Sequence, residues 1–492
     1  MHFELLIRKD IINNLQIMCQ MDLDKMSNKS NFFLNIKYAM VAQLISLVSS
    51  VLTTLLFPRI LGIADFGFWQ LFVFYSGFAG VFHFGLNDGI YLKNGGKDYQ
   101  ELDFNRIGSQ LKLSLLIQLI ISAFIIITAI STISESNRLF VIIAFSLYII
   151  IFNTHGFLGL ILQTTNQAHS LARSIILDKM IFLVLILLSI IFSIENLRIF
   201  IFIFFIGKLC SLFYIMSLGR KIIFSKTIKF KLNLINFYYD MKIGIFLMIA
   251  NITSTLILGF GKFLVDFRWD IITFGQVSFA ISLTTIVLLF INQIGLVIFP
   301  ALSSLDDQNQ KKYFSFIQIF LSLFLPFTYL TYYLLEFILN FWLPNINQSL
   351  LYLILFLPVC IFNSRMSLLS TTFLKAMRKE KALLFINVLF STLSLILTLI
   401  AAYLLNNLIL VLLSLIFSTW IRNVVSEIYL SKILNEKCLS FILKDAFIAV
   451  IFVLVTWFTS SIISGIIILC ISLVNIYVNK QKLFELILIY KK

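Results

Sequence analysis

The chain has 492 residues, of which 60% are hydrophobic and only 12% are charged. Soluble domains average about 45–50% apolar and about 25% charged residues, so this composition excludes a soluble enzyme, a disordered protein and a nucleic-acid-binding domain. The net charge of +15 points to no nucleic-acid partner, because the basic residues cluster in short loops, as they do in membrane proteins. The apolar runs are also too long and continuous for a transmembrane β-barrel.

Long apolar runs between polar breaks predict an all-α polytopic membrane protein with about 14 transmembrane helices, since roughly 20 apolar residues cross a bilayer. The predicted spans are residues 36–57, 68–92, 109–131, 139–162, 175–194, 197–219, 243–265, 275–299, 314–338, 349–373, 382–404, 408–430, 444–460 and 462–478. The last two runs could also form one long re-entrant unit. Pro326 and Pro358 interrupt two of the spans and predict bends there.

The distribution of Lys and Arg predicts the orientation in the membrane. If the N-terminus is placed inside, nearly all of the basic residues outside the spans fall in inner segments. The outer segments hold Arg59, Arg138, Arg198 and Arg268. Because cytoplasmic loops carry the excess of positive charge, both termini are predicted to be cytoplasmic.

The longest loop, residues 220–242, is basic and divides the chain into two halves of six spans. We therefore predict a cytoplasmic tail (1–30), an N-lobe (31–219), a basic linker (220–242), a C-lobe (243–434), and a last segment (435–492) with spans 13 and 14 and a cytoplasmic tail. The two halves share a weak internal sequence repeat: Asp65-Phe66-Gly67 opens span 2, and Thr273-Phe274-Gly275 opens span 8. Parallel repeats of this kind are typical of transporters with a site between two lobes.

No motif in the chain predicts catalysis. The outer loops are a few residues long with isolated acidic residues, and HExxH, GxSxG, Walker and dinucleotide-binding patterns are absent from the sequence. The five cysteines form no CxxC pair, so we predict no metal site, disulfide framework or cofactor. Without a nucleotide-binding loop, transport would depend on an ion gradient, the membrane potential or the substrate's own gradient.

Four basic residues are identified as embedded in the membrane: Lys208, Lys262, Arg365 and Arg422. A Lys or Arg at the centre of a membrane helix costs about 2.5–3.5 kcal/mol on insertion scales, so such residues usually face a bundle interior or a wet cavity. With Asp88 identified as the one embedded carboxylate, we predict a cavity with surplus positive charge that binds an anionic headgroup such as a diphosphate. Alternatives remain for two of them: Lys262 could snorkel to the outer interface, and Lys208 could snorkel inward or pair locally.

Asp88 lies between two glycines in the segment Gly85-Leu-Asn-Asp-Gly89. Glycines let membrane helices approach closely or bend, so this carboxylate would sit at a helix contact. It could bind a coupling cation, or it could pair with an arginine across the bundle.

Several short segments resemble the oligosaccharide flippases of the multidrug/oligosaccharidyl-lipid/polysaccharide exporter superfamily. They are Phe57-Pro-Arg-Ile-Leu-Gly62, Asp65-Phe-Gly67, Phe84-Gly-Leu-Asn-Asp-Gly-Ile90, Gly95-Gly-Lys97, Gly244, Phe274-Gly-Gln-Val-Ser-Phe-Ala280 and Phe299-Pro300. The resemblance covers roughly residues 30–480, and each segment is short and mostly apolar.

The resemblance implies two six-helix lobes around a central cavity, with the terminal helix pair alongside, in a bacterial inner membrane. It implies flipping of undecaprenyl-diphosphate-linked oligosaccharide repeat units to the periplasmic leaflet for O-antigen or capsule assembly, with a polysaccharide polymerase and a chain-length regulator as possible partners. Arg59 matches the family's basic residue near the cavity mouth, whereas Lys208, Lys262, Arg365 and Arg422 are expected cavity cations. A cation-coupled small-molecule exporter of the same fold is the alternative, and a membrane polysaccharide polymerase is a further one.

Overall fold

The computed structural model describes residues 2–303, 307–344 and 347–491, with side chains over 34–289, 291, 309–344 and 348–478. These residues form helices joined by short turns, and no strand occurs among them. The predicted all-α class is therefore confirmed.

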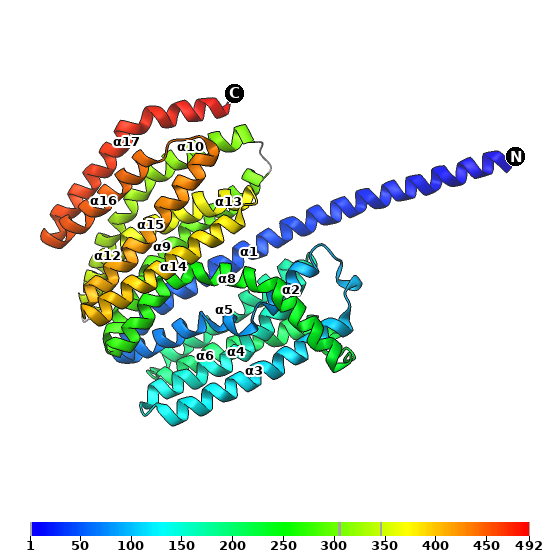
Figure 1. The fold of residues 1–492 in the computed structure, drawn as a ribbon, viewed down its shortest axis with the longest axis horizontal. Helices are drawn as coiled ribbons and strands as arrows, with labels where there is room; N and C mark the ends of the chain where they lie inside the picture. Colours follow the sequence, from blue (N-terminus) through cyan, green and yellow to red (C-terminus); the bar gives the residue numbers. More distant parts are fainter. Residues whose placement is uncertain (1, 304–306, 345–346, 492) are drawn as a thin grey trace.

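The helices form two lobes and a terminal pair (Figure 1). The N-lobe contains α1 (His2–Ser76), η1 (Ala79–His83), α2 (Leu86–Lys93), η2 (Tyr99–Glu101), α3 (Phe104–Thr132), α4 (Ser136–Thr164), α5 (Ala168–Ile191) and α6 (Leu197–Leu218). After α7 (Arg220–Ile223), the C-lobe contains α8 (Phe230–Arg268), α9 (Ile271–Ser303), α10 (Asp307–Phe324), η3 (Leu325–Tyr329), α11 (Leu330–Trp342), α12 (Asn347–Arg365), η5 (Met366–Thr371), α13 (Thr372–Ala376), α14 (Glu380–Leu399), η6 (Ile400–Leu404) and α15 (Leu408–Leu434). The terminal pair is α16 (Leu439–Phe458) and α17 (Ser461–Lys491), two separate helices rather than one re-entrant unit.

Thirteen helical stretches of the described chain are long and apolar enough to cross a membrane. The first, Leu34–His83, has 50 residues; at ~1.5 Å per residue it is about 75 Å long, more than twice the thickness of a bilayer core. It bends at Gly62, whose φ of 74° and ψ of 170° are not helical and suit a residue without a Cβ. Predicted span 1 and the first part of predicted span 2 are thus the two arms of one kinked helix, and the rest of span 2 is divided between η1 and α2. The multi-spanning fold is confirmed.

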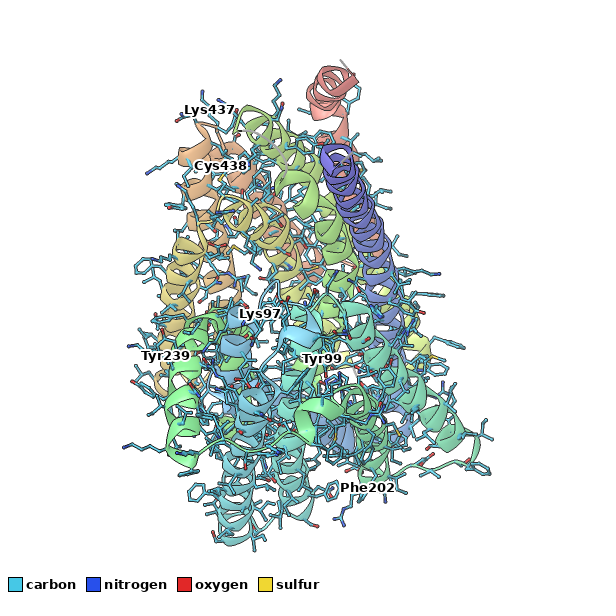
Figure 2. All side chains as sticks on the ribbon, turned by 90° about the vertical axis from the view of Figure 1, so that its right-hand side faces the viewer. Lys97, Tyr99, Phe202, Tyr239, Lys437 and Cys438 are labelled. Atoms are coloured by element: carbon cyan, nitrogen blue, oxygen red, sulfur yellow. The ribbon has the colours of Figure 1, made fainter. Side chains whose placement is uncertain are left out.

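Figure 1 shows the course of α1, which runs from the N-terminus at the far right to the lower left; the chain then returns to α2 near the middle of the picture. The outer end of the molecule is defined here by Arg59, Arg138, Arg198 and Arg268, and the inner end is the opposite one. Figure 2 looks at the inner end, with Lys97 and Tyr99 on the N-lobe and Lys437 at the edge of the C-lobe. The assignment of the inner end to the cytoplasm remains a prediction.

The helical boundaries differ from the prediction at two polar segments. The proposed tail, residues 1–30, belongs to α1 over its described part. The proposed linker, residues 220–242, is largely helical, because α8 begins at Phe230 and continues without a break into span 7. Pro326 behaves as predicted: α10 ends at Phe324 and a 3₁₀ turn precedes α11, whereas Pro358 is accommodated inside α12.

Helix α8 contacts both lobes. Its inner half packs against α2, and its outer half packs against α14 and α15. At the inner end, the buried Asp240 of α8 accepts hydrogen bonds from Arg106 at 2.7 Å and Gln110 at 2.6 Å, and it lies 3.1 Å from the Lys93 ammonium group. A bent or rotated α8 would therefore strain contacts in both lobes at once.

Candidate functional site

A polar pocket of about 330 Å³ lies between the two lobes, and we call it the interlobe pocket. Its walls come from both arms of α1, from α5 and α6, and from α8 and α9 of the C-lobe. Its polar lining residues are Ser49, Ser50, Thr53, Thr54, Gln70, Lys179, Lys262, Ser282 and Thr285. The hydroxyls of this wall all come from predicted spans 1 and 8.

The interlobe pocket is positively charged. Lys262 and Lys179 line it, and no Asp or Glu does so among the described residues. Within the described chain, neither lysine forms an ion pair; the Lys262 ammonium group lies 5.6 Å from the Phe74 ring and 5.8 Å from the Phe274 ring. Several hydroxyls, such as that of Thr285, already donate to a carbonyl of their own helix, so the ammonium groups are the strongest donors left for an anion.

Lys262 was predicted from the sequence as a cavity residue, but Lys179 was missed. Lys179 lies inside predicted span 175–194 but is not among the four embedded cations predicted from the sequence. Its position four residues into an apolar run was the signal that could have found it.

A second polar pocket of about 500 Å³ lies in the C-lobe, and we call it the C-lobe pocket. Arg422 of α15 lines it, together with groups from α8, α9, α12, η5, α13 and α14, and its role in binding substrate stays a prediction. One Nη of Arg422 donates to the Asn363 side-chain oxygen at 2.6 Å, and the other lies 3.5 Å from the Ser254 carbonyl oxygen. Both partners are neutral, so the charge of Arg422 is held in place without being cancelled.

The two pockets adjoin along α8 and α9. On α9, Leu288 lines the C-lobe pocket and Leu289 lines the interlobe pocket. On α8, Leu258 and Lys262 contribute to one pocket each and lie one helical turn apart, about 6 Å along the axis. Both helices therefore contribute to the walls of both pockets.

The structure does not bring Arg365 to either pocket, and its prediction as a cavity cation is wrong. Arg365 is fully buried in the C-lobe. Its guanidinium group donates two hydrogen bonds to Glu427, both at 2.7 Å, and one to Asp445 at 2.6 Å. Three helices, α12, α15 and α16, are joined by this cluster, which gives Arg365 a structural role.

Lys208 is also neutralised, as the alternative interpretation held. Its ammonium group lies 2.8 Å from the carboxylate of the buried Asp178 on α5. The prediction of a single embedded carboxylate was wrong, because Asp178, Glu427 and Asp445 all lie inside predicted spans and each faces a cation on another helix.

Arg59 lies at the outer end, exposed, with its guanidinium carbon 3.8 Å from the centre of the Trp342 ring. The indole N–H of Trp342 donates to the Leu55 carbonyl at 2.9 Å. This hydrogen bond fixes the orientation of the ring against which the guanidinium group packs. Arg59 lines neither polar pocket. Its place at a cavity mouth and its role in binding substrate stay predictions.

Asp88 lies against a histidine rather than an arginine. Its carboxylate is 3.7 Å from Nε2 of His83, and Nδ1 of His83 accepts a hydrogen bond from the Gly85 N–H at 3.0 Å. Nδ1 is thus an acceptor, which leaves the proton of the neutral ring on Nε2, facing Asp88. Asp88 lines neither polar pocket, and its coupling role stays a prediction.

The lobes are closed against each other at the outer end. Gly67 and Gly275, the glycines of the two repeated segments, lie in contact: a Cβ added to Gly275 would be 3.0 Å from Cα of Gly67. Beside them, Asp266 of α8 pairs with Arg138 of α4 at 2.8 Å and accepts a hydrogen bond from the Tyr75 hydroxyl at 2.9 Å. The sequence repeat therefore marks the place where the halves meet.

Comparison with protein-family models and with curated proteins gave no match. Among solved structures, the chain is similar to the lipid II flippase MurJ in an inward closed conformation, with a TM-score of 0.65 and 16% identity over 92% of this chain and 100% of that one. It is also similar to a multidrug resistance MATE family transporter of the MOP superfamily in its inward-facing conformation, with a TM-score of 0.58 and 11% identity over 82% of this chain and 98% of that one. The outward-facing conformation of a MATE family transporter gives a TM-score of 0.52 with 13% identity over 83% and 96% of the two chains.

These similarities concern the fold. The chain is a multi-pass membrane protein with the two-lobed architecture of MurJ and of the MATE transporters. The architecture that the sequence segments implied is thereby confirmed.

Proposed function

We propose that the protein is a flippase that moves undecaprenyl-diphosphate-linked oligosaccharide repeat units from the cytoplasmic to the periplasmic leaflet by alternating access. In this proposal it resides in a bacterial inner membrane with both termini in the cytoplasm, and it serves O-antigen or capsule assembly. The observation that carries the proposal is the interlobe pocket, where Lys179 and Lys262 face a hydroxyl-lined space without a carboxylate among the described lining residues.

The chemistry of the pocket suits a lipid diphosphate. A sugar headgroup cannot cross hydrocarbon unless polar groups replace its water, and Ser, Thr and Gln side chains can do so. A diphosphate brings at least two negative charges, and two ammonium groups in a site of low dielectric would neutralise them. The fold similarity to a lipid II flippase supports a lipid-linked substrate.

A cation-coupled small-molecule exporter is the second candidate, favoured by the fold similarity to MATE transporters. A pocket for organic cations would place carboxylates on its wall, since opposite charges attract strongly in a dry site. The described lining of the interlobe pocket has lysines in that place, which is why the anionic substrate is preferred.

Substitution of the two lysines tests the proposal. In a strain that lacks the gene, undecaprenyl-linked repeat units should accumulate on the cytoplasmic leaflet, and wild-type protein should clear them. We expect Lys262→Ala to reduce surface glycan at least tenfold and the double variant with Lys179→Ala to abolish it, at equal expression. Lys381→Ala, which removes an exposed lysine of α14, is the matched control and should restore glycan fully.

The conservative variant Lys262→Arg should retain partial function, because the positive charge remains. Full restoration of surface glycan by the double alanine variant would refute the anion-binding role. Export of an organic cation by reconstituted protein, with no movement of the lipid-linked sugar, would favour the exporter instead.

A further inference from the structure

The C-lobe pocket differs chemically from the interlobe pocket. Its polar wall consists mainly of side-chain amides and hydroxyls: Asn251, Ser254, Thr255, Asn363, Ser367, Thr371, Asn387 and Thr419. Its charged lining residues are Arg422, Lys375 and Glu380, so the carboxylate offsets one of the two cations. Amides and hydroxyls offer donors and acceptors side by side, which is the pattern that a polyhydroxylated, uncharged ligand requires.

Two polar atoms on this wall are buried without a partner. The side-chain oxygen of Asn387 and Nε of Arg422 make no hydrogen bond within the described structure, and both residues are only 5% exposed. Buried polar atoms are nearly always hydrogen-bonded in folded proteins, because leaving them unpaired is costly. One acceptor and one donor left open on the same wall indicate a ligand that supplies both.

The rest of the guanidinium group is already held. Asn363 and the Ser254 carbonyl engage the two Nη atoms of Arg422, so the guanidinium plane is fixed and Nε keeps its direction. A phosphate would prefer a fork of two guanidinium nitrogens, whereas a single N–H beside amides suits a sugar hydroxyl or acetamido oxygen.

The position of the pocket fits a molecule that begins in the interlobe pocket. Leu258 and Lys262 of α8, which face the two pockets, are one turn apart, about 6 Å along the helix. That separation is comparable to the length of a diphosphate linker. A lipid diphosphate held by Lys262 would thus direct its first sugars toward Asn387.

We propose that the C-lobe pocket is a saccharide subsite, in which Asn387, Thr255 and Nε of Arg422 bind the sugar of a lipid-linked molecule whose diphosphate is held by Lys179 and Lys262. The inference rests on the proposed function, because it assumes a diphosphate in the interlobe pocket. It adds that the sugar contributes its own share of the binding affinity.

The test compares two kinds of lipid probe on the purified full-length chain in lipid nanodiscs. One probe is undecaprenyl diphosphate, and the others carry a single N-acetylglucosamine or galactose on that diphosphate. Wild-type protein should bind at least one of the sugar-bearing probes about tenfold more tightly than the bare diphosphate, which is the scale expected for one or two good hydrogen bonds.

Asn387→Leu should abolish this sugar-dependent gain while leaving the affinity for undecaprenyl diphosphate unchanged. Its melting temperature should be equal to or above that of the wild type, because an unpaired buried polar atom is removed. A purely structural role of Asn387 would instead lower the melting temperature.

Thr255→Val has a matched control in Thr128→Val. Each hydroxyl donates to a carbonyl of its own helix, but Thr255 lines the pocket, whereas Thr128 lies half-buried on α3 and lines neither polar pocket. Only Thr255→Val should weaken the sugar-dependent gain.

The outcomes separate the two proposals. If undecaprenyl diphosphate binds and neither sugar adds affinity, or if Asn387→Leu keeps the gain, the saccharide subsite is refuted and the proposed function stands. If no probe binds above a Lys179→Ala/Lys262→Ala control, the proposed function fails and the subsite fails with it.

Discussion

The membrane-embedded cations of this protein fall into two groups with opposite surroundings. In the C-lobe core, Arg365 lies between Glu427 and Asp445, and in the N-lobe, Lys208 lies against Asp178. By contrast, Lys179 and Lys262 in the interlobe pocket and Arg422 in the C-lobe pocket share their walls with hydroxyl and amide side chains. Since an unpaired charge in a low-dielectric interior is costly, paired cations hold helices together, and unpaired ones remain available to a ligand.

The comparison predicts the largest effect on folding at Arg365. Arg365→Met would leave two carboxylates facing each other at full burial, and breaking such a buried cluster costs about 3–5 kcal/mol. We expect a large drop in the yield of folded protein and in its melting temperature in detergent. The triple variant with Glu427→Gln and Asp445→Asn removes the uncompensated charge and should recover most of the yield; no recovery would mean that Arg365 acts through packing alone.

Breaking the ion pair of Lys208 and Asp178 should also destabilise the protein, but by less than the loss of Arg365. Because the Lys208 side chain is 23% exposed, we expect Asp178→Asn or Lys208→Met to cost about 1–3 kcal/mol. The double variant should be more stable than the sum of the single changes implies, as measured by a double-mutant cycle of thermal unfolding. Strict additivity would contradict an interaction between the two.

The ion pair of Asp266 joins the lobes, so its loss should change conformation more than stability. Asp266→Asn leaves Arg138 without this partner and should shift the equilibrium toward an open outer end by about tenfold, or ~1.4 kcal/mol. The readout uses Gln70→Cys, a substitution in the wall of the interlobe pocket, in a protein without its native cysteines. The rate at which an impermeant maleimide labels this cysteine from the outer side is measured. Glu135→Gln, which alters an exposed partner of the same Arg138, is the control and should leave labelling near the wild-type level.

Arg59 should give the smallest effect on stability. It is exposed and interacts with the Trp342 ring, an arrangement worth about 0.5–1 kcal/mol at exposed sites. We expect Arg59→Ala to leave the melting temperature within a few degrees of the wild type and to lower transport only a few-fold. A loss as severe as that of Lys262→Ala would place Arg59 in the binding site itself.

The sequence predicted the parts of the fold that follow from local composition. Long apolar runs become membrane helices because an α-helix pairs its backbone N–H and C=O groups within its own segment, as lipid requires. The thirteen helical stretches follow the predicted spans closely. The repeated glycines at 67 and 275 also carried tertiary information, because a duplicated fold brings equivalent segments together where the halves meet.

The sequence could not decide which embedded charges are paired. Arg365 and Arg422 look alike in the sequence, each within an apolar run, yet one meets two carboxylates and the other meets none within the described structure. The carboxylates in question lie 62 and 80 residues away from Arg365 along the chain.

What the sequence determined by itself was therefore the helical, multi-spanning character of the chain and the place of its internal repeat, since these depend on hydropathy and spacing along the chain. Only the packing of helices decided which cations face a pocket. Charge pairing depends on distances of about 3 Å between side chains of different helices, and hydropathy along one helix carries no information about its neighbour's charges.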